Sequence, residues 1–564
     1  MRIYSRVFLE QKRKRNEQNR CQPNETTLKI QRPESTVQAT PIPARSAASA
    51  IPATCDVLVV GGGINGAGIA RDLAGRGLSV VLCEKDDLAA HTSSSSTKLI
   101  HGGLRYLEYY EFSLVRKALA EREVLLKSAP HIMWPLRFVM PHDPRSNFLR
   151  PAWMIRVGLF LYDHLAKREV LPGSRGINLR EHVAGQPLKP VFTKGFEYSD
   201  GWVDDARLVV LNALDAAEHG AKVMTGWRCT DAQRNATGWQ MQLQDAHGVQ
   251  RQVSARALVN AAGPWAAQFL QQHAHLHESK TLRLVKGSHI VVKKLFDHDH
   301  AYIFQNPDRR IIFAIPYEGE FTLIGTTDVE SESPIGKAQI DDSEIAYLCE
   351  QASRYFAKPV TAADVVWTYA GVRPLLGDES SDASAVTRDY MLDFDNHAAP
   401  LLTVWGGKIT TFRKLAEEAA DGLCQHLGVK KPAWTAGAHL PGGDLSAWIG
   451  PAVRPDTDFT RFEEELAKRH PQWPAAVRHH LARCYGGRID LVVGADGLGE
   501  EVAPGLFEAE LNYLHTQEWA RCADDVLWRR TKLGLHMTAS DRERVARWCD
   551  ARWGVKTSFL ETKA

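Results

Sequence analysis

Short apolar runs alternate with stretches of helical periodicity along most of the chain, a pattern typical of α/β proteins. Residues 56–60 form an apolar run of strand length, followed by glycines, a helical stretch that ends near Arg76, and a second apolar run at 78–84. Strands that are apolar at consecutive positions are typical of parallel sheets buried on both faces. The pattern therefore predicts a βαβ unit that begins near residue 54.

More strand-like segments lie at 257–260, 289–292, 311–315 and 321–325. Their spacing indicates a mixed sheet inserted into the part of the chain that holds the βαβ unit. After Pro432 helical periodicity dominates, as at 459–469 and 474–483. We therefore predict an α/β part with an inserted sheet over 54–430 and a separate helical C-terminal domain over 431–564. A chain of 564 residues is long enough for two or more domains.

Residues 1–53 differ from the rest of the chain. They contain the basic run Lys12–Arg15, and their second half places Pro41, Pro43 and Pro52 among Ala, Ser and Thr. This composition predicts a disordered extension. A targeting segment and an over-extended start codon both stay open as explanations.

Charge and cysteine content narrow the class of protein. The formal net charge is only +2, so no basic excess indicates a nucleic-acid partner. The nine cysteines form no C-x-x-C pair, which argues against a zinc ribbon or redox dithiol and favours a reducing compartment. The sequence has no apolar run of the roughly 18–20 residues that a membrane-spanning helix needs. We therefore expect any membrane contact to be peripheral.

The glycines after the first strand match a dinucleotide-binding fingerprint. Gly61, Gly63 and Gly66 fit G-x-G-x-x-G between a strand and a helix. They permit a tight turn, close approach to a pyrophosphate and close packing of helix on strand. Glu84 ends the second strand, where a carboxylate accepts hydrogen bonds from an adenosine ribose and disfavours a 2′-phosphate. This Rossmann-like signature leaves NAD and FAD open.

The segment that follows favours FAD. Residues 92–98 are rich in hydroxyl groups, suited to a diphosphate and a flavin, and an apolar, glycine-containing stretch at 99–107 follows at once. A flexible linker would not have this composition.

These motifs, with several others, resemble the FAD-containing, quinone-linked sn-glycerol-3-phosphate dehydrogenases of the aerobic type. The segments that carry the resemblance are 61–77, 92–107, 196–200, 202–208, 286–289, 325–328, 371–375, 387–390, 406–411 and 528–535. Together they cover about 54–564. The chain has no D-x-[DN]-x-[DN]-G loop near its end, so it resembles the shorter bacterial form rather than relatives with calcium-binding hands.

The resemblance implies a glycine-oxidase-like fold: a Rossmann-like FAD domain, an interleaved mixed-sheet substrate domain and a helical cap. It implies oxidation of sn-glycerol 3-phosphate to dihydroxyacetone phosphate, with electrons passing through FAD to ubiquinone. It also implies a protein bound peripherally to the inner face of the plasma membrane, with a homodimer left open. Two rivals are a flavin oxidase of the same fold that reduces oxygen to peroxide, and a non-enzymatic FAD-binding scaffold lacking cationic pocket residues.

The residues expected to bind FAD come from the fingerprint, the hydroxyl-rich loop and two glycine motifs that resemble the family. They are Gly61, Gly63, Asn65, Gly66, Glu84, Thr92, Ser93, Ser96, Thr97, Gly263, Gly407, Lys408 and Thr410. The last four, like the hydroxyl-loop residues, are assigned through the resemblance.

The substrate requires fixed cations for its phosphate and a group that takes the alcohol proton. Arginine matches phosphate bidentately and lysine acts as a point charge. The expected substrate-binding residues are Arg105, Tyr106, Arg373, Arg388 and Lys408. For the proton we expect His101 or His289, with Arg373 as an alternative that stabilises the alkoxide.

One segment suits a membrane interface. Residues 150–162 combine Trp, Phe, Tyr and aliphatic side chains with arginines, and His164, Lys167 and Arg168 follow. Such a helix could lie on anionic headgroups. A core helix with basic ends fits the same periodicity, so both interpretations stay open.

Overall fold

The computed structural model describes residues 51–143, 150–277, 280, 282–331, 334–376, 389–494 and 497–554, all within one compact unit. Most of the predicted N-terminal extension lies outside the described residues, as does Arg388. Ile51 packs against the core, and the Ala53 carbonyl oxygen accepts a hydrogen bond from the Ser254 N–H at 2.9 Å.

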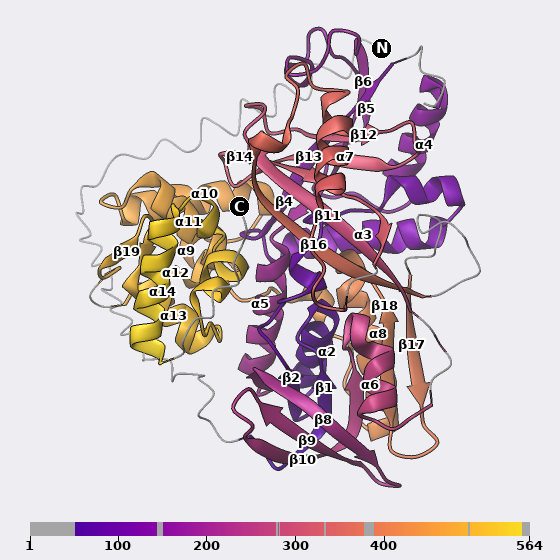
Figure 1. The fold of residues 1–564 in the computed structure, drawn as a ribbon, viewed down its shortest axis with the longest axis vertical. Coiled ribbons are helices and arrows are strands. Elements are labelled where there is room, and N and C mark those ends of the chain that lie inside the picture. The colour runs from indigo at the N-terminus through magenta and orange to yellow at the C-terminus, as the bar shows by residue number, and fades with distance from the viewer. Residues whose placement is uncertain are drawn as a thin grey trace, which may run out of the picture. The chain divides into compact units, whose positions relative to one another are not determined.

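An eight-stranded sheet carries the nucleotide-binding signature (Figure 1). Its main path runs β17 (Tyr390–Asp395), β18 (Leu401–Gly406), β10 (Gln250–Asn260), β1 (Thr54–Val60), β2 (Val80–Glu84) and β7 (Lys222–Thr225). The neighbours from β18 to β7 are parallel, and β17 is antiparallel to β18. An antiparallel pair, β8 (Trp227–Arg234) and β9 (Trp239–Asp245), extends from β10.

Both faces of this sheet are covered, as the sequence predicts. Val57 and Val59 of β1 pack into a cluster with helices α2 (Ile64–Gly75), α5 (Asp205–Glu218) and α8 (Phe412–Leu427). Leu58, between them, packs into a second cluster with β8, β9 and α6 (Ala266–Gln272). The βαβ unit β1–α2–β2 and the burial of its strands on both faces are therefore confirmed.

A ten-stranded mixed sheet forms the inserted part. Its path runs β15 (Val329–Glu330), β11 (Leu282–Lys293), β14 (Phe321–Gly325), β13 (Ile311–Tyr317), β12 (Ala301–Gln305), β4 (Met133–His142), β6 (Lys194–Val203) and β3 (Leu99–Ile100). In addition, β16 (Val365–Leu376) pairs with β11, and β5 (Arg175–Asn178) pairs with β6. Helices α3 (Phe112–Ser128), α4 (Ala152–His164) and α7 (Asp342–Ser353) belong to the same part of the chain.

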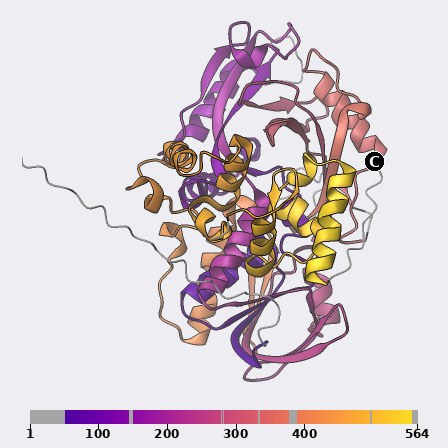
Figure 2. The same cartoon turned by 90° about the vertical axis from the view of Figure 1, so that its left-hand side faces the viewer.

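The C-terminal domain is helical and has its own core. It contains α9 (Ser446–Ile449), α10 (Pro455–Arg469), α11 (Ala475–Tyr485), α12 (Ile489–Val492), α13 (Glu508–Gln517) and α14 (Ala539–Trp553), with a small pair β19 (Glu501–Ala503) and β20 (Leu506–Phe507). Its buried residues, from Leu445 to Cys549, form a separate cluster. Figure 2 shows these orange and yellow helices gathered in front of α5. A π-helical turn, Asp525–Arg530, contacts α5.

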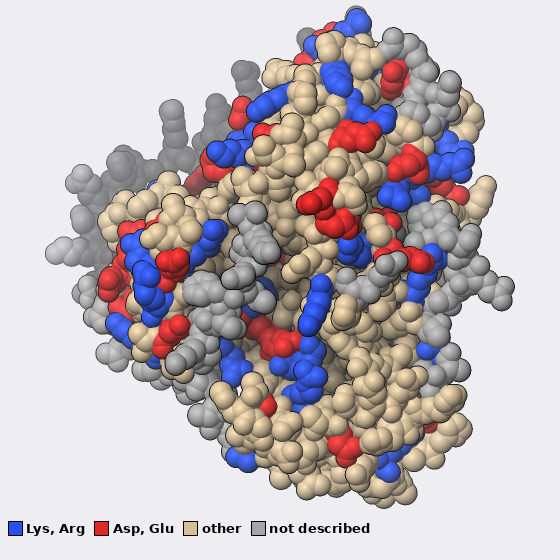
Figure 3. Space-filling model, in the orientation of Figure 1, with Lys and Arg blue, Asp and Glu red and all other residues tan. Residues whose placement is uncertain are grey.

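Charges are mixed over the surface. On the face seen in Figure 3, Lys and Arg side chains lie among Asp and Glu side chains, consistent with the net charge of +2. The eight cysteines that the structure describes are free thiols.

Candidate functional site

The glycine turn after β1 has the geometry that a pyrophosphate cradle needs. Gly61 has φ +109°, a conformation that favours glycine. A Cβ on Gly61 would overlap the Ala261 carbonyl, and a Cβ on Gly66 would overlap the Gly61 carbonyl. The two glycines therefore allow β1, β10 and the start of α2 to approach closely. The first N–H of α2, that of Ile64, donates to the Ser93 hydroxyl at 3.0 Å, and a helix N-terminus of this kind suits an anion.

Glu84 lies buried at the end of β2. Its carboxylate accepts hydrogen bonds from the Gly62 N–H at 2.6 Å and the Asp86 N–H at 2.8 Å. Burial raises the pKa of Glu84 above its ordinary value, and the two N–H donors oppose that effect. The donors hold the carboxylate at the end of the strand, where remaining lone pairs can accept ribose hydroxyl groups.

A cavity of about 840 Å³ opens beside these residues, within the size range of cofactor sites. Eight of the expected cofactor residues line it: Gly61, Gly63, Asn65, Glu84, Thr92, Ser93, Gly263 and Gly407. The Asn65 amide nitrogen donates to the Gly406 carbonyl at 3.2 Å, whereas its buried oxygen has no hydrogen-bond partner. An unpartnered buried acceptor in the wall fits a bound group that supplies a donor.

The other five expected cofactor residues do not line the cavity. Gly66 lies in α2, and Ser96 donates its backbone N–H and hydroxyl to Asp205. The Thr410 hydroxyl accepts the His101 backbone N–H at 3.3 Å. Lys408 precedes the short helix Ile409–Thr411, and Thr97 contacts His289.

Several wall residues escaped the sequence reasoning. Lys85 places its ammonium 4.5 Å from the Trp265 ring centroid, and His91 meets the same ring edge-on at 4.7 Å. Trp265 lies two residues after Gly263, which the sequence analysis did single out, so the sequence could have indicated an aromatic side chain in this wall. Lys85 and His91 both contact the Asp86 carboxylate as well, and with the Trp265 ring they form one wall of the cavity.

The C-terminal domain also contributes to the cavity. Cys522, Asp524, Asp525 and Arg529 line it. Arg529 and Arg530, on the π-helical turn, both bind Asp87, which follows Glu84 in the loop after β2. The carboxylate of Asp87 and the guanidinium of Arg530 are buried. The C-terminal domain is therefore part of the wall of this cavity, joined to it by a buried charge cluster.

His289 is the proton acceptor candidate with the more defined surroundings. It is buried on β11, its Nε2 lies 3.0 Å from the Thr97 hydroxyl, and its ring stacks on Tyr369 at 4.6 Å. Its Nδ1 is buried without a hydrogen-bond partner. Burial, with Arg373 and Lys98 nearby, lowers the pKa of His289 well below its ordinary value. The ring is therefore neutral near pH 7 and one of its nitrogens carries a lone pair, while burial and the two cations make it a weaker base than a free imidazole. His101 presents its ring edge-on to Phe313 at 6.5 Å.

Arg373 lies on β16 beside His289. One Nη donates to the Thr326 hydroxyl at 2.7 Å, and the other pairs with Asp328. A Cβ on Gly287, on the neighbouring strand β11, would overlap this guanidinium. The glycine therefore leaves the room that the arginine occupies between β11 and β14.

Two segments with further substrate candidates meet although about 300 residues separate them. The Lys408 ammonium lies 3.8 Å from the centroid of the Tyr106 ring. Arg105 neighbours Tyr106 in the short helix Leu104–Tyr109 and donates to the Tyr109 hydroxyl at 3.2 Å. Lys408 thus lies against Tyr106, the sequence neighbour of Arg105, whereas Arg388 lies outside the described residues.

Two family models match the chain. Residues 56–413 match the model of FAD dependent oxidoreductases, and residues 433–551 match the C-terminal domain of alpha-glycerophosphate oxidase. A glycerol-3-phosphate dehydrogenase from Pseudomonas aeruginosa is 52% identical over 499 residues, covering 87% of this chain and 94% of the relative. A D-erythritol 1-phosphate dehydrogenase from Brucella abortus is 50% identical, covering 88% of this chain and 98% of the relative.

Solved structures agree with the fold. The glycerol-3-phosphate dehydrogenase from Bacillus halodurans, solved with FAD, has a TM-score of 0.71 and 28% identity, covering 89% of this chain and 91% of that one. A glycine oxidase from Bacillus cereus, with a TM-score of 0.50 and 18% identity over 67% of this chain and 98% of that one, shows the glycine-oxidase-like fold alone. The fold prediction and the FAD prediction are therefore confirmed. The chain belongs to the family of FAD-dependent oxidoreductases that includes the bacterial glycerol-3-phosphate dehydrogenases.

Proposed function

We propose that this protein oxidises sn-glycerol 3-phosphate to dihydroxyacetone phosphate. When bound, FAD accepts the hydride from carbon 2. The observation that carries the proposal is the contact of Lys408 with Tyr106, the neighbour of Arg105, which brings together two distant segments of a chain whose relatives are named for this substrate. A phosphate dianion removed from water needs such fixed partners.

The proton of the C2 hydroxyl requires an acceptor. We assign it to His289, because its Nδ1 is buried and unpartnered and its ring is held by Thr97 and Tyr369. Arg373 on the adjacent strand stabilises the developing alkoxide. Removing a general base costs about 10²- to 10⁴-fold in rate, so His289→Gln should lower kcat accordingly. His101→Gln, at the alternative position, should have the smaller effect.

The phosphate assignment is tested by the ratio of kcat/KM for sn-glycerol 3-phosphate to kcat/KM for plain glycerol. Losing one charge-assisted contact costs about 1.5 to 3 kcal/mol, or roughly ten- to a hundredfold in kcat/KM. Arg105→Ala should therefore impair turnover of sn-glycerol 3-phosphate far more than the weak turnover of plain glycerol. Arg251→Ala, which removes an exposed arginine on β10 where that strand pairs with β9, is the matched control. An unchanged substrate ratio in Arg105→Ala at equal FAD content would refute the assignment.

D-Erythritol 1-phosphate is included in the same assay because one relative of equal similarity is named for it. Both substrates carry a phosphate, so Arg105→Ala should affect both alike. Higher kcat/KM for the longer polyol phosphate would reassign the substrate and leave the phosphate site in place.

We propose that the electrons pass to ubiquinone in the membrane. Eight of the fourteen exposed large hydrophobic residues that the structure describes gather in two segments that contact one another, Leu104–Ser128 and α4. They are Tyr109, Tyr110, Phe112, Trp153, Met154, Val157, Phe160 and Leu161. No described helix is long and apolar enough to cross a bilayer. These side chains suit an interfacial attachment.

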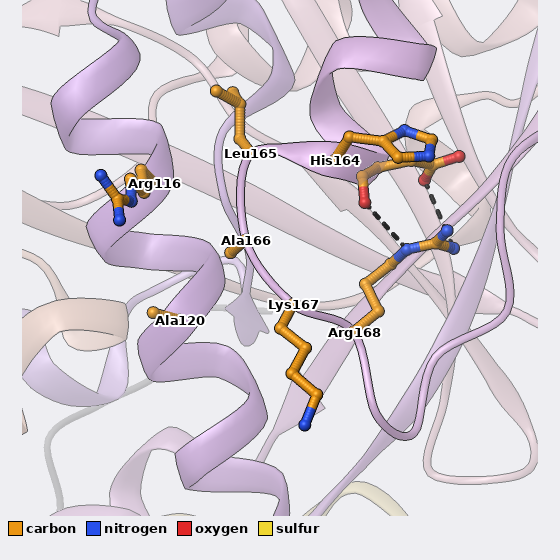
Figure 4. A pocket seen from close by; sticks show the side chains of 8 residues that line it. Arg116, Ala120, His164, Leu165, Ala166, Lys167 and Arg168 are labelled. Carbon is orange, nitrogen blue, oxygen red and sulfur yellow. Dashed lines mark hydrogen bonds and ion pairs between the residues drawn. The ribbon is translucent and has the colours of Figure 1, made fainter.

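A basic cavity of about 530 Å³ adjoins α4 (Figure 4). Arg116 and Ala120 lie on α3, and residues 164–168 face them across the opening. Lys167 is largely exposed, with 83% of its side chain accessible, while Arg168 donates to the Asp163 carbonyl at 3.0 Å. Bases beside exposed aromatic residues suit anionic headgroups.

The helix α4 has two apolar faces. Ile155, Leu159 and Tyr162 are buried, whereas Trp153 is 66% and Phe160 57% exposed. Replacing Trp153 and Phe160 by serine should reduce sedimentation with anionic vesicles while dye-coupled activity persists. Val453→Ser, at an exposed apolar residue of the C-terminal domain, is the control. Vesicle binding that survives the double variant would place the membrane contact elsewhere.

The oxidase alternative is tested with purified protein, sn-glycerol 3-phosphate and either a soluble quinone analogue or air. Quinone reduction with little peroxide supports the proposal. Stoichiometric peroxide without quinone reduction would make oxygen the acceptor.

A further inference from the structure

Among the described residues, two groups of three side chains could hold a metal ion, and their surroundings differ. In the first, Glu197 accompanies His182 and His300, but Arg137 and Arg175 both pair with the Glu197 carboxylate. Two guanidinium groups already neutralise that acid and repel a second cation. This group is therefore an ion-pair cluster rather than a metal site.

The second group lies in the C-terminal domain, away from the FAD cavity lining. It consists of His480 and Cys484 on α11 and Glu510 on α13. Positions i and i+4 share one face of a helix, and the side chain of the later residue leans back toward the earlier one. The Cys484 sulfur accordingly lies 3.7 Å from His480 Nδ1, and Glu510 Oε1 lies 2.7 Å from His480 Nε2.

The carboxylate of Glu510 is incompletely satisfied. The residue is fully buried, and Oε1 is close to both the His480 ring and the Tyr485 hydroxyl, each at 2.7 Å. Oε2 is buried and has no hydrogen-bond partner. A buried carboxylate oxygen without a partner is costly, and a cation would satisfy it.

The cations nearest this group are already committed. Arg207 donates to the Cys484 carbonyl at 2.7 Å, but its guanidinium pairs with Glu518. Arg530 offers its backbone carbonyl to the Cys484 thiol, while its guanidinium pairs with Asp87. Among the described residues, no Lys or Arg forms an ion pair with Glu510, in contrast to Glu197.

We propose that His480, Cys484 and Glu510 form a Zn²⁺ site in the C-terminal domain. Thiolate, imidazole and carboxylate are the donors that zinc prefers, and one thiolate with one carboxylate balances its charge. One ion binds a single imidazole nitrogen. At Nε2, tetrahedral bonds of about 2.1 Å separate nitrogen and carboxylate oxygen by roughly 3.4 Å, so Glu510 Oε1, now at 2.7 Å, must draw back, and the Cys484 thiol, now nearest Nδ1, must move toward Nε2. All three donor atoms lie within 4.8 Å of one another, so the widest pair must close by about 1 Å.

Three protein ligands leave a fourth position for water. His480 keeps 12% of its side chain exposed, which gives solvent and the ion a way in. The Tyr485 hydroxyl holds Glu510 from behind, as outer-shell partners of metal ligands do. The entering ion displaces the thiol proton of Cys484, so binding releases a proton to the buffer.

The test uses the full-length, FAD-loaded protein, stripped with chelator and titrated with ZnCl₂. We expect one tightly held Zn²⁺ per chain by elemental analysis after gel filtration. Co²⁺ in its place should give thiolate-to-cobalt absorption. Cys484→Ser should weaken Zn²⁺ binding at least about 100-fold and abolish that absorption, and Tyr485→Phe should weaken binding about 10- to 100-fold.

Two matched variants separate this site from general damage. Cys549→Ser alters another buried cysteine of the same core and should leave the zinc stoichiometry at one. His182→Gln alters the other group and should also leave it at one. Zinc retained by Cys484→Ser, zinc lost in His182→Gln, or no zinc bound by the wild type would each overturn the proposal. The proposal would also be overturned if iodoacetamide alkylated Cys484 at the same rate with and without Zn²⁺. None of these readouts depends on substrate turnover.

Discussion

Replacing Asp87 by alanine would remove the carboxylate that two arginines of the C-terminal domain share. Arg530 binds it through two hydrogen bonds of 2.7 and 2.8 Å, and Arg529 through one of 2.6 Å. Burial pushes the pKa of Asp87 upward, but Arg530 and Arg529 outweigh it and hold the pKa below its ordinary value. The carboxylate is therefore ionised, and its loss leaves Arg530 without its ion pair, whereas Arg529 keeps Asp525.

Breaking a buried ion pair by removing one partner costs about 3 to 5 kcal/mol. Arg530 is fully buried and keeps only the Glu518 carbonyl and longer-range charges, so Asp87→Ala should lie in that range. Asp421→Ala is the matched control. Asp421 also pairs with an arginine, Arg76, but is 55% exposed, and Arg76 retains Asp72 at 2.5 Å. An exposed pair of this kind contributes at most about 1 kcal/mol.

The assay is urea unfolding of the FAD-loaded protein, followed by both flavin fluorescence and circular dichroism, because a chain with two cores need not unfold in one step. Arg529 lines the cofactor cavity, so Asp87→Ala should release flavin at lower urea than it loses helix signal. The Asp421→Ala curves should nearly overlay the wild type. If Asp87→Ala and Asp421→Ala lost equal stability, the buried cluster would not be what joins the cap to the cofactor site.

Three further changes have defined outcomes. Gly325→Ala places a Cβ against the His289 ring and should lower kcat at unchanged FAD content, measured by flavin absorbance and turnover. Burial, with the nearby Asp204, raises the pKa of Glu318 from 4.5 to about 7. The stability that protonated Glu318 contributes is therefore complete below pH 4.5 and is lost as the pH rises to 7. In urea unfolding, Glu318→Gln should match the wild type at pH 4 and be more stable than it by at most about 3 kcal/mol at pH 8. Glu84→Arg replaces a ribose acceptor by a donor and should weaken FAD binding, measured by retention of flavin on gel filtration.

Local pattern predicted the β1–α2–β2 unit and its glycine turn, for a physical reason. The strand β1, the glycine turn, α2 and Glu84 lie within about thirty consecutive residues, so their geometry follows from neighbours in sequence. Glycine tolerance and the burial of parallel strands act over that range. Most of the expected residues from this segment line the cavity.

Contacts between distant segments were beyond that reasoning. Thr97 meets His289 across 192 positions, and Arg530 meets Asp87 across 443. The hydrophobic periodicity of a segment does not indicate which distant residue it contacts. The helix α4 shows a related limit, because apolar residues on both of its faces satisfy a core helix and an interfacial helix alike. Only the packing of one face reveals that the other is left exposed.

The charge cluster at Asp87 bears on how the domains depend on FAD. Glu84, the expected ribose acceptor, ends β2 three residues before Asp87, and Arg529 of the C-terminal domain lines the same cavity. A ligand that binds only the arrangement with the cap docked stabilises that arrangement by RT ln(1 + [L]/Kd). FAD binding then favours docking of the C-terminal domain, and docking raises the affinity for FAD by the same factor. Substitutions in the C-terminal domain would therefore first weaken FAD binding, and activity would fall as a consequence of that loss.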